Sequence, residues 1–307
     1  MQDHNGQTAI DVFNQSQDLY SCEILRKHLA PELPAKTTDG KQCQKLLQAA
    51  IEGQVDVVQE LLTQGVDPMS VDETGCSALF KAVLHNQSDV VECLLLGRGK
   101  DLLRQKDFQW HDTPLIRAAH LGLAGIMKQL LAYFPDLEDQ QFQSKTALHI
   151  AAQSGRKEAV QVLLAHGAQV FTQSNEKGTP LHGAVQFNRV EVLEQLLRAN
   201  DAGKCLEHKN QWGDTPLWIA VFHNHPECAQ ALVQKQASVH VANNDGQTVL
   251  HLVIQNELYG FLEKNKDLFN RQDINARNRW NRTPLMVAQK QKRHRFVKLL
   301  TSLRDQD

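Results

Sequence analysis

Apolar and polar residues alternate along the chain in a pattern that predicts pairs of short amphipathic helices. In residues 145–170, Leu148 and Ala151 share the face of a first helix, and Val160 and Leu163 share the face of a second. Spacings of three and four residues are typical of an α-helix with one buried face. A glycine or asparagine, which tolerates the left-handed backbone conformation of a tight turn, separates the two helices. These residues are Gly53, Asn86, Gly122, Gly155, Asn188 and Asn224.

This two-helix pattern recurs at steps of 33 to 36 residues, which predicts a repeat array. Each copy carries a leucine, often within Thr-Pro-Leu, and a generic helical bundle would not keep such a step. Threonine favours the N-cap of a helix, and proline suits its first turn. The leucines are Leu46, Leu79, Leu115, Leu148, Leu181, Leu217, Leu250 and Leu285.

The motif resembles that of the ankyrin repeat family over essentially the whole chain. The best copy is KTALHIAAQSGRKEAVQVLLAHGAQV, residues 145–170. The resemblance implies a mainly α solenoid of helix-turn-helix units joined by short β-hairpin-like finger loops, in a single array over residues 1–307. The approximate units, with the first degenerate and the last capping, are 1–36, 37–70, 71–104, 105–137, 138–170, 171–205, 206–239, 240–272 and 273–307.

Several segments depart from this motif. Val253 and Ile254 stand where small residues are expected. Gly260 lies inside the following helix and predicts a less stable repeat at this point, because glycine destabilises a helix interior. Insertions should lengthen the connections at 97–100 and 200–204. A polar final helix over 290–303 should cap the array. The first unit, interrupted at 30–34, also fits the end of a preceding array.

Composition and charge narrow the protein class. The 307 residues include 33 Gln and 16 Asn. The formal net charge is −2, which excludes a globally basic protein of the kind that coats nucleic acid. Neither a transmembrane run nor a signal peptide is visible in the sequence. The cysteines are far apart and predict reduced thiols in the cytosol. They are Cys22, Cys43, Cys76, Cys93, Cys205 and Cys228.

Charge is distributed unevenly along the chain. Residues 264–307 contain 12 Lys and Arg against 4 Asp and Glu, whereas the preceding residues are acidic overall. This basic pole can be a solvated cap, or it can bind an acidic protein, nucleic acid or anionic lipid. Its residues include Arg277, Arg279, Arg282, Lys290, Lys292, Arg293 and Arg295.

Aromatic residues gather at two repeat-equivalent places. Trp110, Trp212 and Trp280 each lie three positions before a motif threonine, at the tip of a finger loop. Tryptophan is a frequent hot-spot residue at interfaces, although each ring could instead pack on the neighbouring finger.

The second place is on the first helices. Trp218 replaces the motif histidine, and Phe222 follows four residues later on the same helical face. Phe187, Leu121 and His223 occupy positions that usually face solvent. With Trp212 they form a candidate aromatic patch for a partner, unless they fill gaps between repeats.

Motifs for catalysis are missing. The sequence holds no P-loop, GxSxG, HExxH or EF-hand pattern. His223, His225 and Cys228 lie across a helix turn and make a poor metal site. The resemblance implies that His149, His182 and His251 are structural. We therefore expect no enzyme activity, no metal and no cofactor.

Three functional hypotheses follow from the sequence. The first is a non-catalytic scaffold, monomeric when alone, that binds partner proteins through the concave face. The second is a recognition module of a larger enzyme or adaptor, and the third is a basic pole that binds nucleic acid or anionic membrane. The composition also resembles that of ankyrin effectors that intracellular bacteria deliver into the host cytosol without a signal peptide, which would make the protein a virulence factor.

Overall fold

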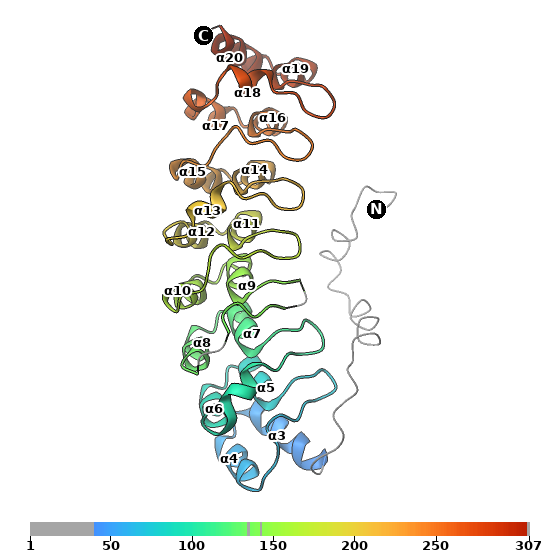
Figure 1. Ribbon diagram of the computed structural model, residues 1–307, viewed down its shortest axis with the longest axis vertical. Coiled ribbons are helices and arrows are strands. Elements are labelled where there is room, and N and C mark those ends of the chain that lie inside the picture. The colour runs from blue at the N-terminus through green and yellow to red at the C-terminus, as the bar shows by residue number, and fades with distance from the viewer. Residues whose placement is uncertain (1–39, 134–135, 142, 306–307) are drawn as a thin grey trace. The chain divides into compact units, whose positions relative to one another are not determined.

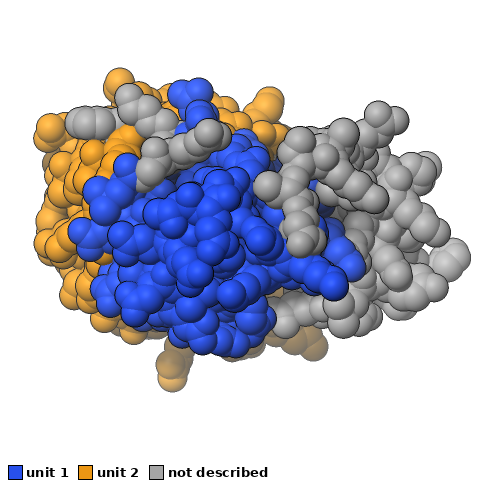
Figure 2. Space-filling view, turned by 90° about the horizontal axis from the view of Figure 1, so that it is seen from below, with its two compact units in different colours: residues 1–113 blue, residues 114–307 orange. Residues whose placement is uncertain are grey.

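The chain divides into two compact units, residues 1–113 and 114–307 (Figure 2). The computed structural model describes residues 40–133, 136–141 and 143–305, and only the backbone of 97–100. The predicted first repeat, with the interruption at 30–34 and Cys22, lies outside the described residues.

Both units are built from pairs of helices. Unit 1 has α3 (Gly40–Glu52) and α5 (Ala78–Leu84) as first helices, followed by α4 (Val55–Thr63) and α6 (Ser88–Leu103) as second helices. The first helices of unit 2 are α7 (Pro114–Leu121), α9 (Ala147–Ser154), α11 (Pro180–Gln186), α14 (Pro216–Phe222), α16 (Val249–Gln255) and α19 (Pro284–Lys290). Its second helices are α8 (Ala124–Leu131), α10 (Lys157–Ala165), α12 (Val190–Leu196), α15 (Pro226–Gln234), α17 (Tyr259–Lys264) and α20 (His294–Arg304).

In unit 2 the first helices pack on one another in chain order, and the second helices lie beside them (Figure 1). The loops that precede the first helices project to the opposite side (Figure 1). Among the described residues the only β pairing is an isolated bridge between Val71 and Ser77 of unit 1, so the fingers are turns rather than strands. No helix in the described part of the chain is long and apolar enough to cross a membrane.

Two of the expected boundaries were wrong, at 97–100 and at the start of the final helix. Residues 97–100 do not lengthen a connection, because α6 continues to Leu103 and buries both Leu102 and Leu103. The connection at 200–204 is lengthened as expected, and it contains an additional short helix, α13 (Gly203–Leu206). The final polar helix starts at His294, because Lys292 takes a left-handed conformation with φ 56°. Near it lie η1 (Lys266–Leu268) and α18 (Arg271–Asn275).

The helix starts and turns form as the sequence predicts. The hydroxyl oxygens of Thr215 and Thr283 each accept a hydrogen bond from the backbone N–H three residues later, and proline follows both threonines. All six predicted turn residues have positive φ, from 53° at Asn188 to 80° at Gly122. The turn before α17 does so with Glu257 (φ 59°), a residue that sequence reasoning did not select.

Small side chains allow the helices to pack closely. The motif alanines Ala151, Ala184 and Ala220 are 0% exposed. In the unit that departs from the motif, Val253 and Ile254 are also fully buried, while Gly260 lies within α17, which has only six residues. The short second helix α17 buries less apolar surface than a longer one would, in the same repeat whose sequence departs from the motif.

A side-chain oxygen organises each of the best-defined fingers in unit 2. Asn210 Oδ1 accepts hydrogen bonds from the backbone N–H groups of Trp212 and Asp214, at 3.0 and 2.9 Å. Asn278 Oδ1 does the same for Trp280 and Arg282, at 3.1 Å each. Neighbouring fingers are then joined by backbone bonds, such as Asn244 N to Trp212 O at 3.1 Å. The finger tips are therefore held in a defined conformation.

A second series of bonds joins four of the first helices of unit 2, α9, α11, α14 and α16, to the next repeat. The ring Nε2 of His149, His182 and His251 bonds to a backbone oxygen 29 to 32 residues ahead, at distances of 3.1, 3.3 and 3.0 Å. Each acceptor, Gly178, Asp214 or Arg282, directly precedes the next capping threonine. We call this series the ring ladder.

Trp218 occupies the histidine position and continues the ring ladder. Its indole N–H donates to the Gln247 carbonyl oxygen at 3.1 Å, and Gln247 precedes Thr248. The ring is only 7% exposed. An indole can replace the imidazole here because both rings carry an N–H donor at the far edge.

The ladder histidines are held in the neutral form. Nδ1 of His149 accepts the Thr146 backbone N–H at 3.2 Å, which leaves the proton on Nε2. Burial lowers the pKa of His149 to about 4, although its bond to the Gly178 carbonyl opposes this shift. Burial likewise lowers the pKa of His182 to about 4. Protonation would therefore add a proton to Nδ1, break its bond with the Thr146 backbone N–H and place a charge in a buried site.

Replacing Gly213 with alanine should destabilise unit 2. Gly213 has φ 81°, and a Cβ atom there would lie 2.5 Å from the backbone nitrogen of Asn244. We expect a loss of about 2 kcal/mol or more, since the left-handed conformation alone costs about 1–2 kcal/mol. Gly167 has φ 88° with open space around it, so Gly167→Ala is the matched control and should cost less. Equal urea midpoints for the two variants would contradict the predicted clash.

Trp218→Ala should destabilise the protein by about 3–5 kcal/mol, since it removes a buried ring and a ladder bond. Trp218→His should lose only about 1–2 kcal/mol, because imidazole keeps an N–H donor for the Gln247 carbonyl. Urea unfolding followed by circular dichroism measures both. If histidine proved no better than alanine, the hydrogen bond would not be what stabilises this joint.

Stability should fall as the pH is lowered from 7 to 5. The folded pKa of His149 and His182 lies below the usual 6.5, so the unfolded chain takes up protons first and is favoured by acid. The loss should be about 2 kcal/mol per histidine over this range. His149→Gln should reduce the dependence, because glutamine does not take up a proton in this range. An undiminished pH dependence in His149→Gln would argue against this titration.

Candidate functional site

The candidate site lies on the surface of unit 2 that its finger loops and first helices form together, here called the finger face. Two cavities open on it. One, of about 50 Å³, is lined by residues of α9, α11 and α14 and by fingers that include Glu176 and Trp212. The other, of about 340 Å³, is lined by residues of α16 and α19 and by the fingers at Gln247 and 278–282.

One position of the repeat contributes a side chain to these cavities from four first helices of unit 2. It lies two residues before the left-handed turn residue, near the end of each first helix. The position contributes Gln153 and Gln186 to the small cavity, and Gln255 and Lys290 to the large one. In α14 the same position is Phe222. We call this series of residues the variable row.

Phe222 is the most exposed aromatic ring of the predicted patch, at 52%. It stacks on Trp218 with ring centroids 5.0 Å apart and planes 15° apart, and His223 meets its edge at 5.1 Å. Trp218 was predicted as part of the exposed patch, and this placement was wrong. Because its N–H is needed by the ring ladder, Trp218 is buried and supports Phe222 from below.

Trp212 is 42% exposed at the tip of its finger. It lines the small cavity with His149, His182 and Ile219. The same cavity includes Lys145 and Glu176, and burial lowers the pKa of Lys145 while the Glu176 charge opposes the shift. An apolar ring and two opposite charges therefore lie around one hollow.

Phe187 and Leu121 are exposed at 42% and 37%. Both directly precede a left-handed turn residue, and Ser154 holds the equivalent position in the repeat between them. Leu121 is therefore separated from Phe187 by one polar repeat. Phe187 ends α11, which packs against α14, the helix that carries Phe222.

The remaining finger tryptophans differ from each other. Trp280 is 46% exposed, lines the large cavity, and has the Arg279 guanidinium 4.3 Å from its ring centroid. Trp110 belongs to unit 1 and is half-buried, with its backbone N–H donating to Asp107 Oδ1 at 3.1 Å.

Some cations of the basic pole are bonded to neighbouring side chains, whereas others line the large cavity or are exposed. Arg279 pairs with Asp245 at 2.7 Å, and Arg293 pairs with Glu257 at 3.0 Å. Arg277 donates to Asn281 Oδ1 at 2.9 Å. Arg282 and Lys290 line the large cavity, and Lys292 and Arg295 are exposed.

The described side chains offer little reactive chemistry. Burial raises the pKa of Cys205 to about 12 and that of Cys228 to about 11, so both thiols are protonated at neutral pH. Their sulfur atoms contact the Val170 carbonyl and Asn188 Oδ1 rather than a histidine. Within the part of the chain that the structure describes, no three His, Cys, Asp or Glu residues are placed to hold a metal ion.

Sequence reasoning missed most of the large cavity. It selected Trp280, Arg282 and Lys290 there, but not the other lining residues. Comparing the fifth residue after each motif leucine would have identified Gln255, after Leu250, as the equivalent of Phe222, after Leu217. Met286, 44% exposed at the ladder position of α19, was also missed. The other missed residues are Gln247, Gln255, Asn278, Val287 and Gln291.

Comparison with known proteins agrees with this architecture. A family model described as ankyrin repeats, in three copies, matches residues 15–106, 46–141, 93–174, 115–208 and 181–266. An ankyrin repeat protein of Rickettsia felis is 32% identical over 85 residues, and the match spans 27% of this chain and 27% of that relative.

The fold is also similar to a solved structure. The human ASB11 ankyrin repeat domain superposes with a TM-score of 0.58 and 27% identity, covering 67% of this chain and 90% of that one. Ankyrin repeats in general mediate interactions between proteins. Because the family model matches most of its length, the chain belongs to the ankyrin repeat family.

Proposed function

We propose that this protein is a non-catalytic scaffold that binds partner proteins through the finger face of unit 2. The observation that carries the proposal is the exposure of large rings on a fixed support. Phe222 is held by stacking on buried Trp218, and Trp212 is held by the Asn210 turn. Rings that need little ordering on binding make effective anchors, because less conformational entropy is lost.

The surroundings of these rings support a protein partner. The variable row beside Phe222 consists of Gln186 in α11 and Gln255 in α16, which can hydrogen bond to a peptide backbone. Apolar anchors surrounded by polar groups are the usual arrangement of a binding hot spot. Trp212 and Phe222 are therefore the central residues, and Phe187 extends the same surface.

The remaining parts of the proposal concern chemistry and location. A role without catalysis is supported by the protonated thiols of Cys205 and Cys228. It is also supported by His149, which is neutral and has both ring nitrogens in hydrogen bonds. Four described cysteines, Cys76, Cys93, Cys205 and Cys228, form no disulfide, which supports a reducing compartment such as the cytosol. The proposals of a monomer and of an effector delivered into a host cell rest on sequence composition and family resemblance.

Trp212→Ala combined with Phe222→Ala should abolish capture of the partner while leaving the fold intact, since both rings are exposed. Loss of two hot-spot side chains should weaken binding by about 30-fold or more. Affinity capture from cell lysate, read by mass spectrometry, identifies partners retained by the wild type alone. Their dissociation constants are then measured with purified proteins.

The matched control replaces exposed apolar residues away from the finger face. Leu96 in α6 and Leu268 in η1 are 74% and 43% exposed. Leu96→Ala with Leu268→Ala should capture the same proteins as the wild type. If Trp212→Ala with Phe222→Ala also retained every partner at unchanged affinity, the proposed surface would be wrong.

A further inference from the structure

The large cavity of the finger face has a distinct chemical character. Its wall contains two cations, Arg282 and Lys290, and four amide side chains, including Gln247 and Gln255. Trp280 and Val287 supply its apolar part. None of the eight lining residues is acidic. A volume of about 340 Å³ is enough for one or two side chains of a ligand.

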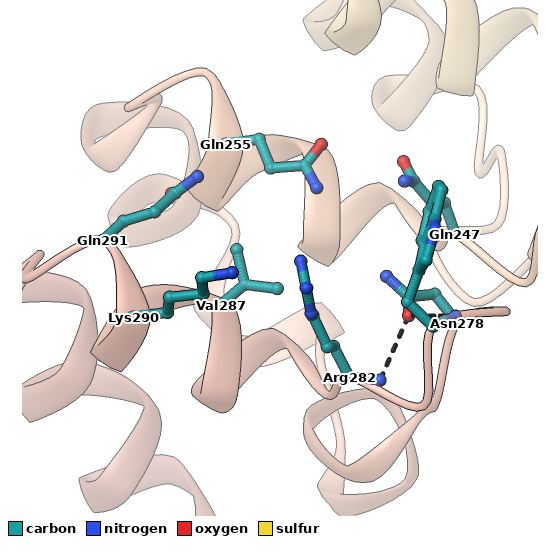
Figure 3. A pocket seen from close by; sticks show the side chains of 8 residues that line it. Gln247, Gln255, Asn278, Arg282, Val287, Lys290 and Gln291 are labelled. Atoms are coloured by element: carbon teal, nitrogen blue, oxygen red, sulfur yellow. Dashed lines mark hydrogen bonds between the residues drawn. The ribbon is translucent and has the colours of Figure 1, made fainter.

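The two cations of this cavity are available for a ligand. In the described part of the chain neither Arg282 nor Lys290 forms an ion pair, whereas nearby Arg279 and Arg293 each have a carboxylate partner. Figure 3 shows the side chains of Arg282, Lys290 and Gln255 pointing toward the same space, although they come from a finger, α19 and α16. The uncompensated charge therefore lies inside the hollow.

The backbone of Arg282 is held in place before any ligand arrives. Its N–H donates to Asn278 Oδ1 at 3.1 Å, the contact drawn in Figure 3, and its carbonyl oxygen bonds to His251 Nε2 at 3.0 Å. The ring ladder thus fixes the backbone from which the Arg282 side chain extends into the cavity. A guanidinium binds carboxylates well, because its two parallel N–H groups match their geometry.

We infer that this cavity binds an Asp or Glu side chain from an acidic segment of the partner protein. The inference rests on the proposed function, because it names the chemistry that the finger face recognises at this end. Arg282 and Lys290 hold the carboxylate, the glutamine amides donate hydrogen bonds, and Trp280 and Val287 contact the methylene groups of the ligand.

The position of the cavity relative to the aromatic anchors defines the spacing in the partner. Phe222 ends α14, and Lys290 ends α19, with α16 packed between these two helices. Packed helices lie about 8–10 Å apart, so the two positions are separated by about 16–20 Å. An extended chain advances about 3.3 Å per residue. The acidic residue should therefore lie about five or six positions from an apolar anchor residue.

The same observations favour an acidic peptide over nucleic acid. A nucleic-acid surface needs a continuous groove of free cations and open aromatic faces on which bases can stack. Here Arg279 already covers one face of Trp280, and both Arg279 and Arg293 are paired with carboxylates. Two open cations within a small hollow fit a single carboxylate better than a phosphate backbone.

The test uses a library of random 12-residue peptides, selected on the full chain and on two charge-reversed variants. The cavity variant is Arg282→Glu with Lys290→Glu. The matched control is Lys157→Glu with Lys235→Glu, which makes the same change of charge at exposed sites outside the basic pole. Circular dichroism confirms the folding of each protein. Single-stranded RNA of 20 nucleotides and phosphatidylserine vesicles are tested as competing anionic ligands.

We expect peptides selected on the wild type to contain Asp or Glu five or six residues from an aromatic or aliphatic residue. Their dissociation constants should rise about tenfold or more in the cavity variant and remain close to the wild type in the control. Acidic enrichment that survives in the cavity variant would overturn the inference. RNA or vesicle binding that depends on Arg282 and Lys290, without binding of peptides, would also overturn the inference.

The same selection separates this inference from the proposed function. Peptides without acidic residues that still need Trp212 and Phe222 would leave the proposed function in place and overturn the carboxylate site. Peptides that bind equally well without Trp212, Phe222, Arg282 and Lys290 would overturn both.

Discussion

The hydrogen bond from a buried ring N–H to the carbonyl ahead of the next capping threonine is the interaction on which four of the five joints between first helices in unit 2 depend. In a repeat array each repeat contacts only its neighbours, so no distant part of the fold compensates for a weak joint. The bond joins the start of one first helix to the start of the next. It also holds the backbone of Gln247 and Arg282, from which the finger face is built.

The joint made by Trp218 shows how this constraint permits variation. Any side chain with a ring N–H at the right distance completes the ladder, so an indole can replace an imidazole. The larger ring also provides a flat surface on which Phe222 stacks. Tryptophan at position 218 therefore keeps the bond between repeats and also supports the exposed ring of Phe222. In this way a buried residue contributes to a binding surface.

Much of the fold can be predicted from the sequence because its determinants are local. Threonine caps, proline at the first turn and left-handed glycine or asparagine act within a few residues, and the structure confirms them at Thr215 and Asn188. The errors arose where tertiary packing decides. Helix α6 continues through its glycines because Leu102 and Leu103 become buried, and Glu257 takes a turn conformation that its residue type does not favour.

The site was less predictable because its residues come from different repeats. The exposure of Trp212 and Phe222 follows from their register, but the large cavity requires Gln247, Lys290 and a finger to meet in space. The variable row explains how this chemistry can change without changing the fold. Gln186, Phe222, Gln255 and Lys290 hold equivalent places on the same backbone, so each repeat presents an amide, a ring or a cation at a similar position. Recognition thus depends on the order of these side chains along the stack.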